Sequence, residues 1–299
     1  MIKFVSVVIC LACFAASALA QETLPSPGIT PDSWLYGLDR ALEAIQKALV
    51  FTPEAKAKLS LQLATERLAE AREMIEKGEV ELAKKVAKDY KEELTHAVTY
   101  GAEIKDLAKK KEFDEMVALA TTTHIEVLED VLEKVPDEAK SAIELAMEVS
   151  RKGQEECLSR LSNTEPEKAL KLYFMIAEKR LEKIKKEAKE ENVEEIKKIA
   201  EDYKSKINKS INIMINETEN KSAIFEIVAN ATSKHLEVLE ELLGEVPDEA
   251  KNAIEKAMNV SIKGQQEALE ALEKVKPEKA KEIRKQVLEK VGILIKKLK

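Results

Sequence analysis

Aromatic residues, glycine, proline and cysteine are all scarce in this sequence of 299 residues. Aromatic residues make up 4% of it, and it holds 8 Gly, 8 Pro and 3 Cys. Strands draw on aromatic and β-branched residues and need frequent turns, so this composition excludes a β-rich fold. A hydrophobic content of 44% is too high for a disordered chain. We therefore predict an all-α protein.

A stretch of one charge sign is also missing. The 49 basic and 56 acidic residues are interleaved, and the formal net charge is -7. Because there is no basic stripe, the sequence argues against a nucleic-acid partner. Glu and Lys spaced four residues apart are typical of solvated helix faces.

Long apolar runs are absent except at the N-terminus. There, Lys3 precedes an apolar stretch at residues 4–16, and an A-x-A motif ends at Ala20. This pattern is typical of a secretory signal peptide and is too short for a membrane span. We predict that residues 1–20 are removed by cleavage between Ala20 and Gln21. The mature chain would then be extracytoplasmic, either secreted or in the cell envelope.

Two alternatives stay open for this N-terminus: an uncleaved anchor, and a lipoprotein modified at Cys13. Cleavage would leave Cys157 as the single thiol, so no internal disulfide would form and packing alone would stabilise the fold. Residues 21–30 form a predicted linker. No later run reaches 18 apolar residues, so we expect no transmembrane span in the mature chain.

The chain contains an internal repeat. Residues 124–153 and 235–264 are identical at 21 of 30 positions, around a shared V-P-D-E-A-K motif. A second pairing begins at Pro53 and Pro166, and a third start follows at Pro277. The predicted plan is a leading helix, two repeat units, and a truncated third repeat that forms a capping helix: residues 31–51, 53–165, 166–276 and 277–299.

Each unit contains four predicted helices, with apolar residues at helical spacing. Thr52 and Pro136 mark helix starts, and Gly78 marks a stop. The leading helix has Thr30-Pro31-Asp32 as its predicted cap. It carries an apolar stripe that we expect a bundle to bury: Trp34, Leu35, Leu38, Ala41, Leu42, Ile45, Ala48 and Leu49. Short connections make neighbours antiparallel, which predicts an elongated, coiled-coil-like repeat of about ten helices.

Several of these residues resemble a known family. P-D-S-W-L-Y at residues 31–36, F-T-P-E at 51–54 and R-L-A-E-A at 67–71 are similar to the family called domain of unknown function 5667. The resemblance covers about residues 31–94. It implies an all-helical exported or membrane-attached protein, of a kind found mainly in archaea. The family has no established activity, so the resemblance assigns no functional residue.

His124 and His235 occupy the same repeat position on an apolar helix face. Counting from the turn at Pro136 places each histidine opposite a serine and a glutamine of the next helix. We interpret each set as a buried polar layer that sets the register between helices. The two sets are His124, Ser150, Gln154 and His235, Ser261, Gln265. The alternative is a metal or catalytic site, but no second ligand lies on this face.

Other catalytic arrangements are not found in the sequence. Gly153 and Gly264 lie inside helical patterns, which indicates close helix approach or a kink rather than a phosphate loop. Cys157 is replaced by Ala268 in the second copy, so we expect a packing role. We predict no catalytic residue, no cofactor and no metal, and hence no enzyme.

Five N-x-S/T sequons lie in the second unit and are candidates for N-glycosylation in an exported protein: Asn208, Asn216, Asn220, Asn230 and Asn259. The first choice for function is a non-enzymatic scaffold or protein-interaction surface of the cell envelope, with an unidentified protein partner and oligomers allowed. The alternatives are an extracytoplasmic holdase chaperone, a metal-responsive binding protein and, third, a hydrolytic or redox enzyme dependent on the two histidines.

Overall fold

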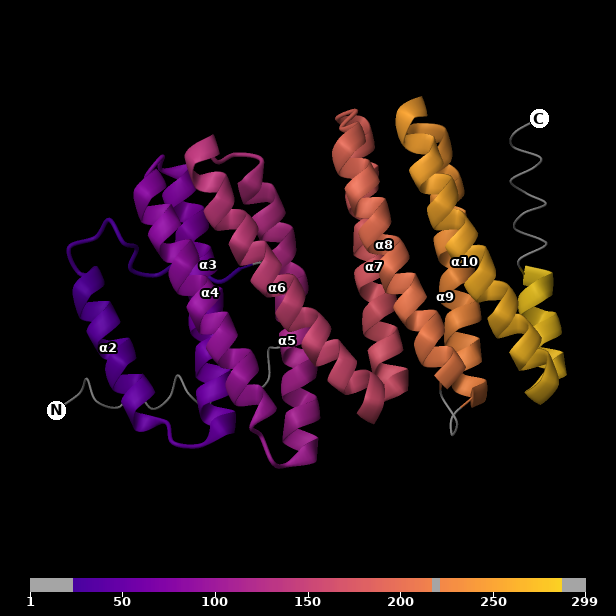
Figure 1. Cartoon of the computed structure of the whole chain (residues 1–299), viewed down its shortest axis with the longest axis horizontal. Helices are drawn as coiled ribbons and strands as arrows, with labels where there is room; N and C mark the ends of the chain where they lie inside the picture. Colours follow the sequence, from indigo (N-terminus) through magenta and orange to yellow (C-terminus); the bar gives the residue numbers. More distant parts are fainter. Residues whose placement is uncertain (1–23, 217–220, 287–299) are drawn as a thin grey trace. The chain divides into compact units, whose positions relative to one another are not determined.

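The computed structural model describes residues 24–216 and 221–286, and this part of the chain is helical without a strand (Figure 1). The prediction of an all-α fold is therefore confirmed. The predicted signal peptide, its cleavage site, Asn220 and residues 287–299 lie outside the described residues. The helices are α2 (Tyr36–Leu49), α3 (Pro53–Glu76), α4 (Val80–Ala102), α5 (Leu107–Leu132), α6 (Asp137–Thr164), α7 (Pro166–Lys189), α8 (Val193–Asn216), α9 (Lys221–Glu245) and α10 (Asp248–Val275).

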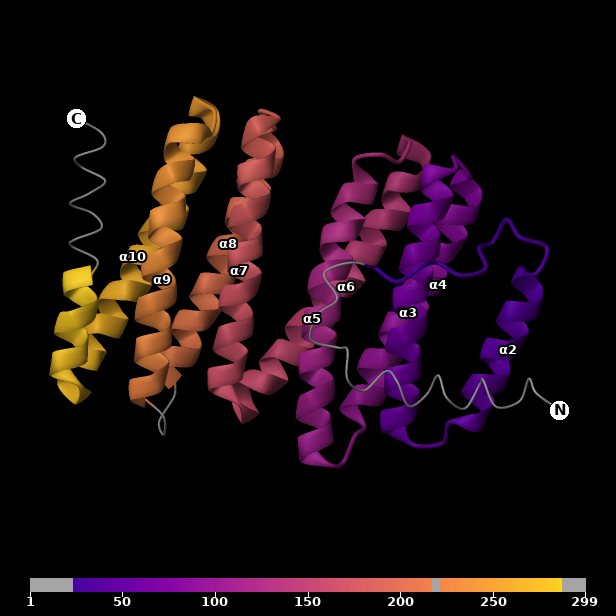
Figure 2. The same ribbon diagram turned by 180° about the vertical axis from the view of Figure 1, so that it is seen from behind.

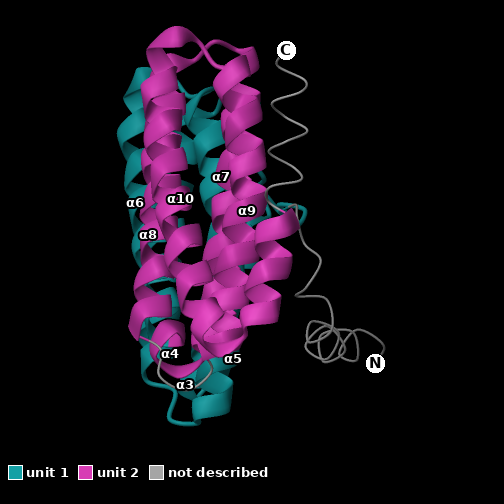
Figure 3. Ribbon diagram, turned by 90° about the vertical axis from the view of Figure 1, so that its right-hand side faces the viewer, with its two compact units in different colours: residues 1–160 teal, residues 161–299 magenta. Residues whose placement is uncertain are grey.

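The chain divides into two compact units, Met1–Arg160 and Leu161–Lys299 (Figure 3). The first contains α2 to α5 and most of α6, and the second contains α7 to α10 and a further helical stretch at 277–286. The division falls inside α6, whereas the sequence repeat places the boundary after residue 165. Residues 277–286 begin the predicted capping helix.

The first unit packs α3, α4, α5 and α6 around one hydrophobic core. Its buried residues include Leu68, Leu94, Phe113 and Ile143. Gly101 of α4 lies against the Phe113 ring, at a distance that leaves no room for a Cβ atom. Gly101 is thus required for close packing between α4 and α5, a role that the sequence pattern does not reveal.

Helix ends follow the sequence signals in this unit. The Thr52 hydroxyl accepts a hydrogen bond of 3.2 Å from the backbone N–H of Ala55, which caps α3. Gly78 follows α3 with φ +77°, and the Glu79 N–H bonds the Met74 carbonyl at 2.8 Å. This is a Schellman ending, in which a left-handed residue turns the chain out of the helix. The turn is tight, and α3 and α4 therefore run antiparallel (Figure 1).

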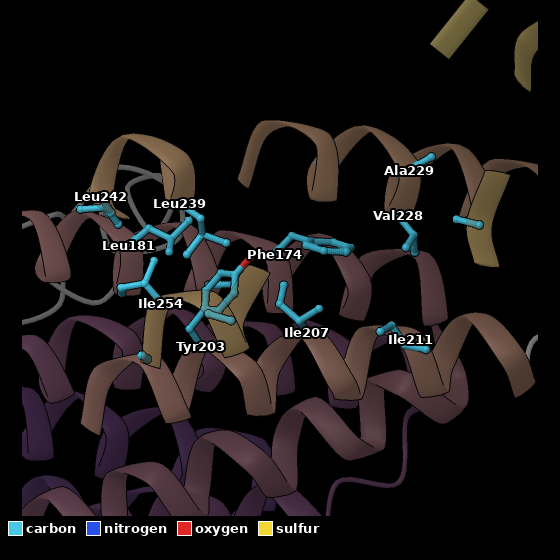
Figure 4. Close-up of a cluster of buried hydrophobic side chains, with 14 of the residues drawn as sticks. Phe174, Leu181, Tyr203, Ile207, Ile211, Val228, Ala229, Leu239, Leu242 and Ile254 are labelled. Atoms are coloured by element: carbon cyan, nitrogen blue, oxygen red, sulfur yellow. The ribbon is translucent and has the colours of Figure 1, made fainter. Parts of the chain in front are cut away.

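The second unit repeats this packing with α7 to α10. Figure 4 shows Phe174 and Tyr203 among aliphatic side chains from neighbouring helices, including Ile207 and Leu239. The Schellman ending recurs after α7, where the Asn192 N–H bonds the Glu187 carbonyl at 3.1 Å. Here the left-handed position is held by Glu191, with φ 55°, in place of glycine.

The predicted start of the leading helix is wrong. Residues 31–35 form turns, and α2 begins at Tyr36 after Leu35, which makes no side-chain cap. The Thr30 hydroxyl donates to the Asp32 carboxylate instead of capping a helix. Asp32 in turn pairs with Lys77 at 2.8 Å, which ties this turn to the end of α3.

Candidate interaction surface

α2 packs against α3 and α4 through its polar side. Arg67 of α3 is 0% exposed, and its guanidinium forms an ion pair with Glu43 of α2. The same guanidinium donates to the Tyr36 hydroxyl at 2.6 Å, and it lies 2.9 Å from the Glu70 carboxylate. The Tyr36 hydroxyl donates to Glu70 at 3.0 Å, which closes the network. We call these residues, Tyr36, Glu43, Arg67 and Glu70, the arginine cluster.

Burial dominates the electrostatics of the arginine cluster. Loss of water raises the pKa of Glu70 to about 7, although Arg67 and the Tyr36 hydrogen bond pull it downward. The pKa of Glu43 is also raised, for the same first reason. At the ends of α2, Lys47 pairs with Glu93 and Arg40 lies 3.4 Å from Asp89. Three of the four charged residues of α2 are thus engaged by ion pairs.

The opposite side of α2 is apolar and exposed. Leu38, Leu42, Ile45 and Leu49, which we call the α2 seam, have exposed fractions of 51% to 67%. Trp34 and Phe51 flank the seam and are exposed by 89% and 80%. Within the first unit, no described helix lies on the side of α2 that faces away from α3 and α4 (Figures 1 and 2). The prediction that a bundle buries this stripe is wrong. α2 contacts the first unit through its polar side, at the arginine cluster, so its apolar side faces away.

The first polar layer is built around a tyrosine. The Tyr90 hydroxyl lies 3.1 Å from Nδ1 of His124 and 2.5 Å from the Ser150 hydroxyl, and His124 Nε2 lies 3.1 Å from the Thr65 hydroxyl. The Ser150 hydroxyl donates to the Ala146 carbonyl at 2.8 Å, and its oxygen accepts from the Tyr90 hydroxyl. Thr65 donates to the Leu61 carbonyl at 2.9 Å. The layer therefore links α3, α4, α5 and α6.

The second layer repeats the arrangement. Tyr203 lies 3.2 Å from Nδ1 of His235 and 2.7 Å from Ser261, and the ring of Phe174 meets His235 edge-on. The prediction that the glutamines belong to the histidine layers is wrong, because Gln154 donates to Thr122 and Gln265 donates to Ser233. The tyrosines were missed, although the repeated Asp-Tyr-Lys at residues 89–91 and 202–204 marks them.

Both histidines are held neutral. Burial lowers the pKa of His124 to about 3 and that of His235 to about 4, since a charged imidazole would lose its hydration. In the described ranges, no group of three or more His, Cys, Asp or Glu side chains is placed to hold a metal ion. The geometry of the layers supports a role in packing and register.

The remaining features offer little room for a ligand. A hollow between α3 and α5, lined by residues including Arg72, Val127 and Lys134, has a volume of about 30 Å³. Such a volume holds a water or two rather than a substrate. Cys157 is buried, and burial raises the pKa of its thiol, which opposes thiolate formation. Within the part of the chain described, no helix is both long and apolar enough to cross a bilayer.

Most of the chain matches one known protein family. A model described as Domain of unknown function (DUF5667) matches residues 28–138 and 155–249, which is more than half of the sequence. The chain belongs to the DUF5667 family. Neither the curated proteins nor the solved structures contain a match. The resemblance expected over residues 31–94 is confirmed, and the match to DUF5667 extends well beyond it.

The two DUF5667 segments place α2 within the repeat. Both end at the same repeat position, Glu138 and Glu249 of the V-P-D-E motif. The first segment begins shortly before α2 and the second within the C-terminal part of α6. In each case a helix precedes the Pro-Glu start of the next one. α2 thus corresponds, in its place before a Pro-Glu helix start, to the C-terminal part of α6.

A stretch of α10 is similar in sequence to part of α2 but differs in burial. α2 contains A-L-E-A-I at residues 41–45, and α10 contains A-L-E-A-L at 268–272, shortly before the start at Pro277. Leu269 and Leu272 are buried in the core of the second unit. The residues at the same places in the α2 stretch, Leu42 and Ile45, are exposed. Similar local sequences thus have buried leucines in α10 and exposed apolar side chains in α2.

The sequons lie mainly on exposed helix positions. Asn208, Asn230 and Asn259 are exposed within α8, α9 and α10, and Asn216 is the exposed last residue of α8. Gly153 and Gly264 have close neighbours, because an added Cβ would lie 3.1 Å from Val98 and 3.0 Å from Ile211 respectively. Close helix approach therefore explains both glycines.

Proposed function

We propose that this protein is a non-enzymatic helical-repeat scaffold of the cell envelope, and that the α2 seam is its protein-interaction surface. One observation carries the proposal: four large apolar side chains lie exposed along one side of α2, with exposed Trp34 and Phe51 flanking them in sequence, while the other side of α2 is ion-paired to α3. Monomeric soluble proteins seldom leave a continuous apolar patch of this kind without a partner. The predicted signal peptide supports the envelope location.

The arginine cluster supports a binding role for α2. A helix held only by exposed ion pairs would detach readily, since such pairs contribute little. Arg67 is buried and bonded to both Glu43 and Glu70, so a buried ion pair, and not only exposed ones, holds α2 on the first unit. A fixed surface binds without the entropy cost of being ordered first.

Site-specific photo-crosslinking in the native host tests the proposal. A photoreactive residue at Leu42 is expected to cross-link to protein, whereas one at Leu145 of α6, which is 48% exposed, is not. Leu145 is the matched control because it is an apolar helical residue of similar exposure. Equal cross-linking from both positions, or none from Leu42, would contradict the proposal.

The same exposed seam also supports the second candidate, a holdase chaperone. A holdase binds unfolded chains broadly, while a scaffold binds one partner. The purified protein would then suppress aggregation of unrelated unfolded clients, and Leu42→Glu would remove that effect. Unchanged aggregation in the presence of the protein would exclude this candidate.

A further inference from the structure

We propose that the α2 seam binds a second copy of this chain, with the two α2 helices packed antiparallel. The inference rests on the proposed function, because it names the partner of that surface. An antiparallel pair uses the same patch on both copies and closes after two, as in the commonest symmetric dimers.

The spacing of the seam is that of a coiled coil. Leu38, Leu42, Ile45 and Leu49 follow each other at intervals of four, three and four residues. This alternation keeps a narrow apolar line facing a single partner helix. Ala41 and Ala48 are exposed beside the seam, and their small side chains let a second helix approach closely.

The area of the surface is sufficient for a stable dimer. The exposed surface of the seam, Trp34 and Phe51 together is on the order of 800 Å² per copy, if their exposed fractions are applied to the full areas of these residues. A standard interface buries roughly 800 Å² per partner. The seam lies at the centre and the two aromatic residues lie at its ends, so an antiparallel pair places each aromatic residue near the far end of the partner helix.

The charges on α2 favour a second copy over a lipid surface. α2 has four charged residues, and Arg40, Glu43 and Lys47 are paired within the first unit. This leaves Asp39 as the charged residue beside the seam, so two copies meet with little repulsion. Helices that lie on membranes use free Lys and Arg beside the apolar face, and both basic residues of α2 are bound to carboxylates.

Sedimentation of the whole chain tests the inference. We expect the wild-type protein to be a dimer at micromolar concentration. Leu42→Glu should weaken the dimer at least about 100-fold, because a carboxylate would be buried at its centre. Leu145→Glu should leave the dimer unchanged, and circular dichroism should show equal helix content in all three proteins. A wild-type monomer, or a Leu42→Glu dimer as stable as wild type, would overturn the inference.

The single tryptophan reports what covers the seam. In a dimer, the emission of Trp34 should shift to the blue as concentration rises, and this shift should disappear in Leu42→Glu. A monomer whose Trp34 shifts only on adding phosphatidylcholine vesicles would identify a lipid occupant. A monomer with shielded Trp34 at every dilution would identify another segment of the same chain. Either result overturns the second-copy inference.

The crosslinking experiment separates this inference from the proposed function. A wild-type monomer that still cross-links from Leu42 to a different protein would refute the second copy and leave the interaction surface standing. A monomer that cross-links to nothing from Leu42 would refute both.

Discussion

The guanidinium of Arg67 lies 2.9 Å from the carboxylate of Glu70, one turn further along α3, and both side chains are buried. Sequence spacing of this kind is common on solvated helix faces, where such pairs contribute little. Here the pair lies under α2 and is shared with Glu43 and Tyr36. The attachment of α2 to the first unit therefore depends on charge rather than on apolar packing.

Replacing Arg67 with alanine should destabilise the first unit by about 3 to 5 kcal/mol, because two buried carboxylates would lose their ion pair with Arg67. Arg72→Ala is the control, since Arg72 pairs with Glu76 at 2.9 Å on the exposed side of the same helix. We expect that change to cost less than about 1 kcal/mol. Urea unfolding followed by circular dichroism measures both. Similar losses for the two variants would contradict the burial argument.

The arginine cluster should also make stability depend on pH. The pKa of Glu70 is about 7 in the folded protein and 4.5 in the unfolded chain, so the folded state favours the protonated carboxyl. Its contribution is present below pH 4.5 and is lost as pH rises through 7, by at most about 3 kcal/mol. Glu70→Gln should remove this loss. The measurement is the difference in urea midpoint between wild type and Glu70→Gln from pH 5 to 8. A constant difference would refute the prediction.

The polar layers should act in the opposite direction. His124 and His235 have folded pKa values of about 3 and about 4, both below the unfolded value of 6.5. Their contribution is present above pH 6.5 and is lost as pH falls toward 4, by about 3 kcal/mol per layer. Combined replacement by glutamine should flatten the acid side of the stability profile. The exposed His96 provides the control, and His96→Gln should leave that profile unchanged.

The two Schellman endings predict opposite effects of exchanging their left-handed residues. Glu191 has φ 55°, a conformation that costs a residue with a Cβ atom about 1 kcal/mol, so Glu191→Gly should stabilise the second unit by about that amount. Gly78→Ala should destabilise the first unit by about 1 kcal/mol, although nothing lies near the added Cβ. Thermal melting of both variants checks the pair. A stabilising effect of Gly78→Ala would contradict the prediction.

The helices and several of their ends could be predicted from sequence, because the decisive interactions there are local. Pro53 with its Thr52 cap begins α3, and Gly78 ends it, as expected. These signals act within one turn of the chain. Pro31 misled the prediction of α2, since Thr30 bonds Asp32 and the chain makes a turn before the helix begins.

The packing of α2 could not be predicted, because it depends on residues distant in the sequence. Hydrophobic spacing identifies an apolar face, but it does not reveal whether another helix covers that face. α2 is held by Arg67, and helical spacing alone does not distinguish Arg67 from a solvated residue. The tyrosines of the polar layers were missed for a similar reason. Tyr90 and Tyr203 bond histidines and serines of other helices, and only their recurrence in the repeat marks them.

α6 continues without interruption through the point where the chain divides into two units. Domains are usually joined by exposed linkers, and proteases cut such linkers first. A protease cleaves a segment of extended chain, and a continuous helix provides such a segment only after local unfolding. Limited proteolysis should therefore not release the two units as separate fragments at Arg160. In this chain, the two compact units share helix α6 and would be degraded together rather than separated by cleavage.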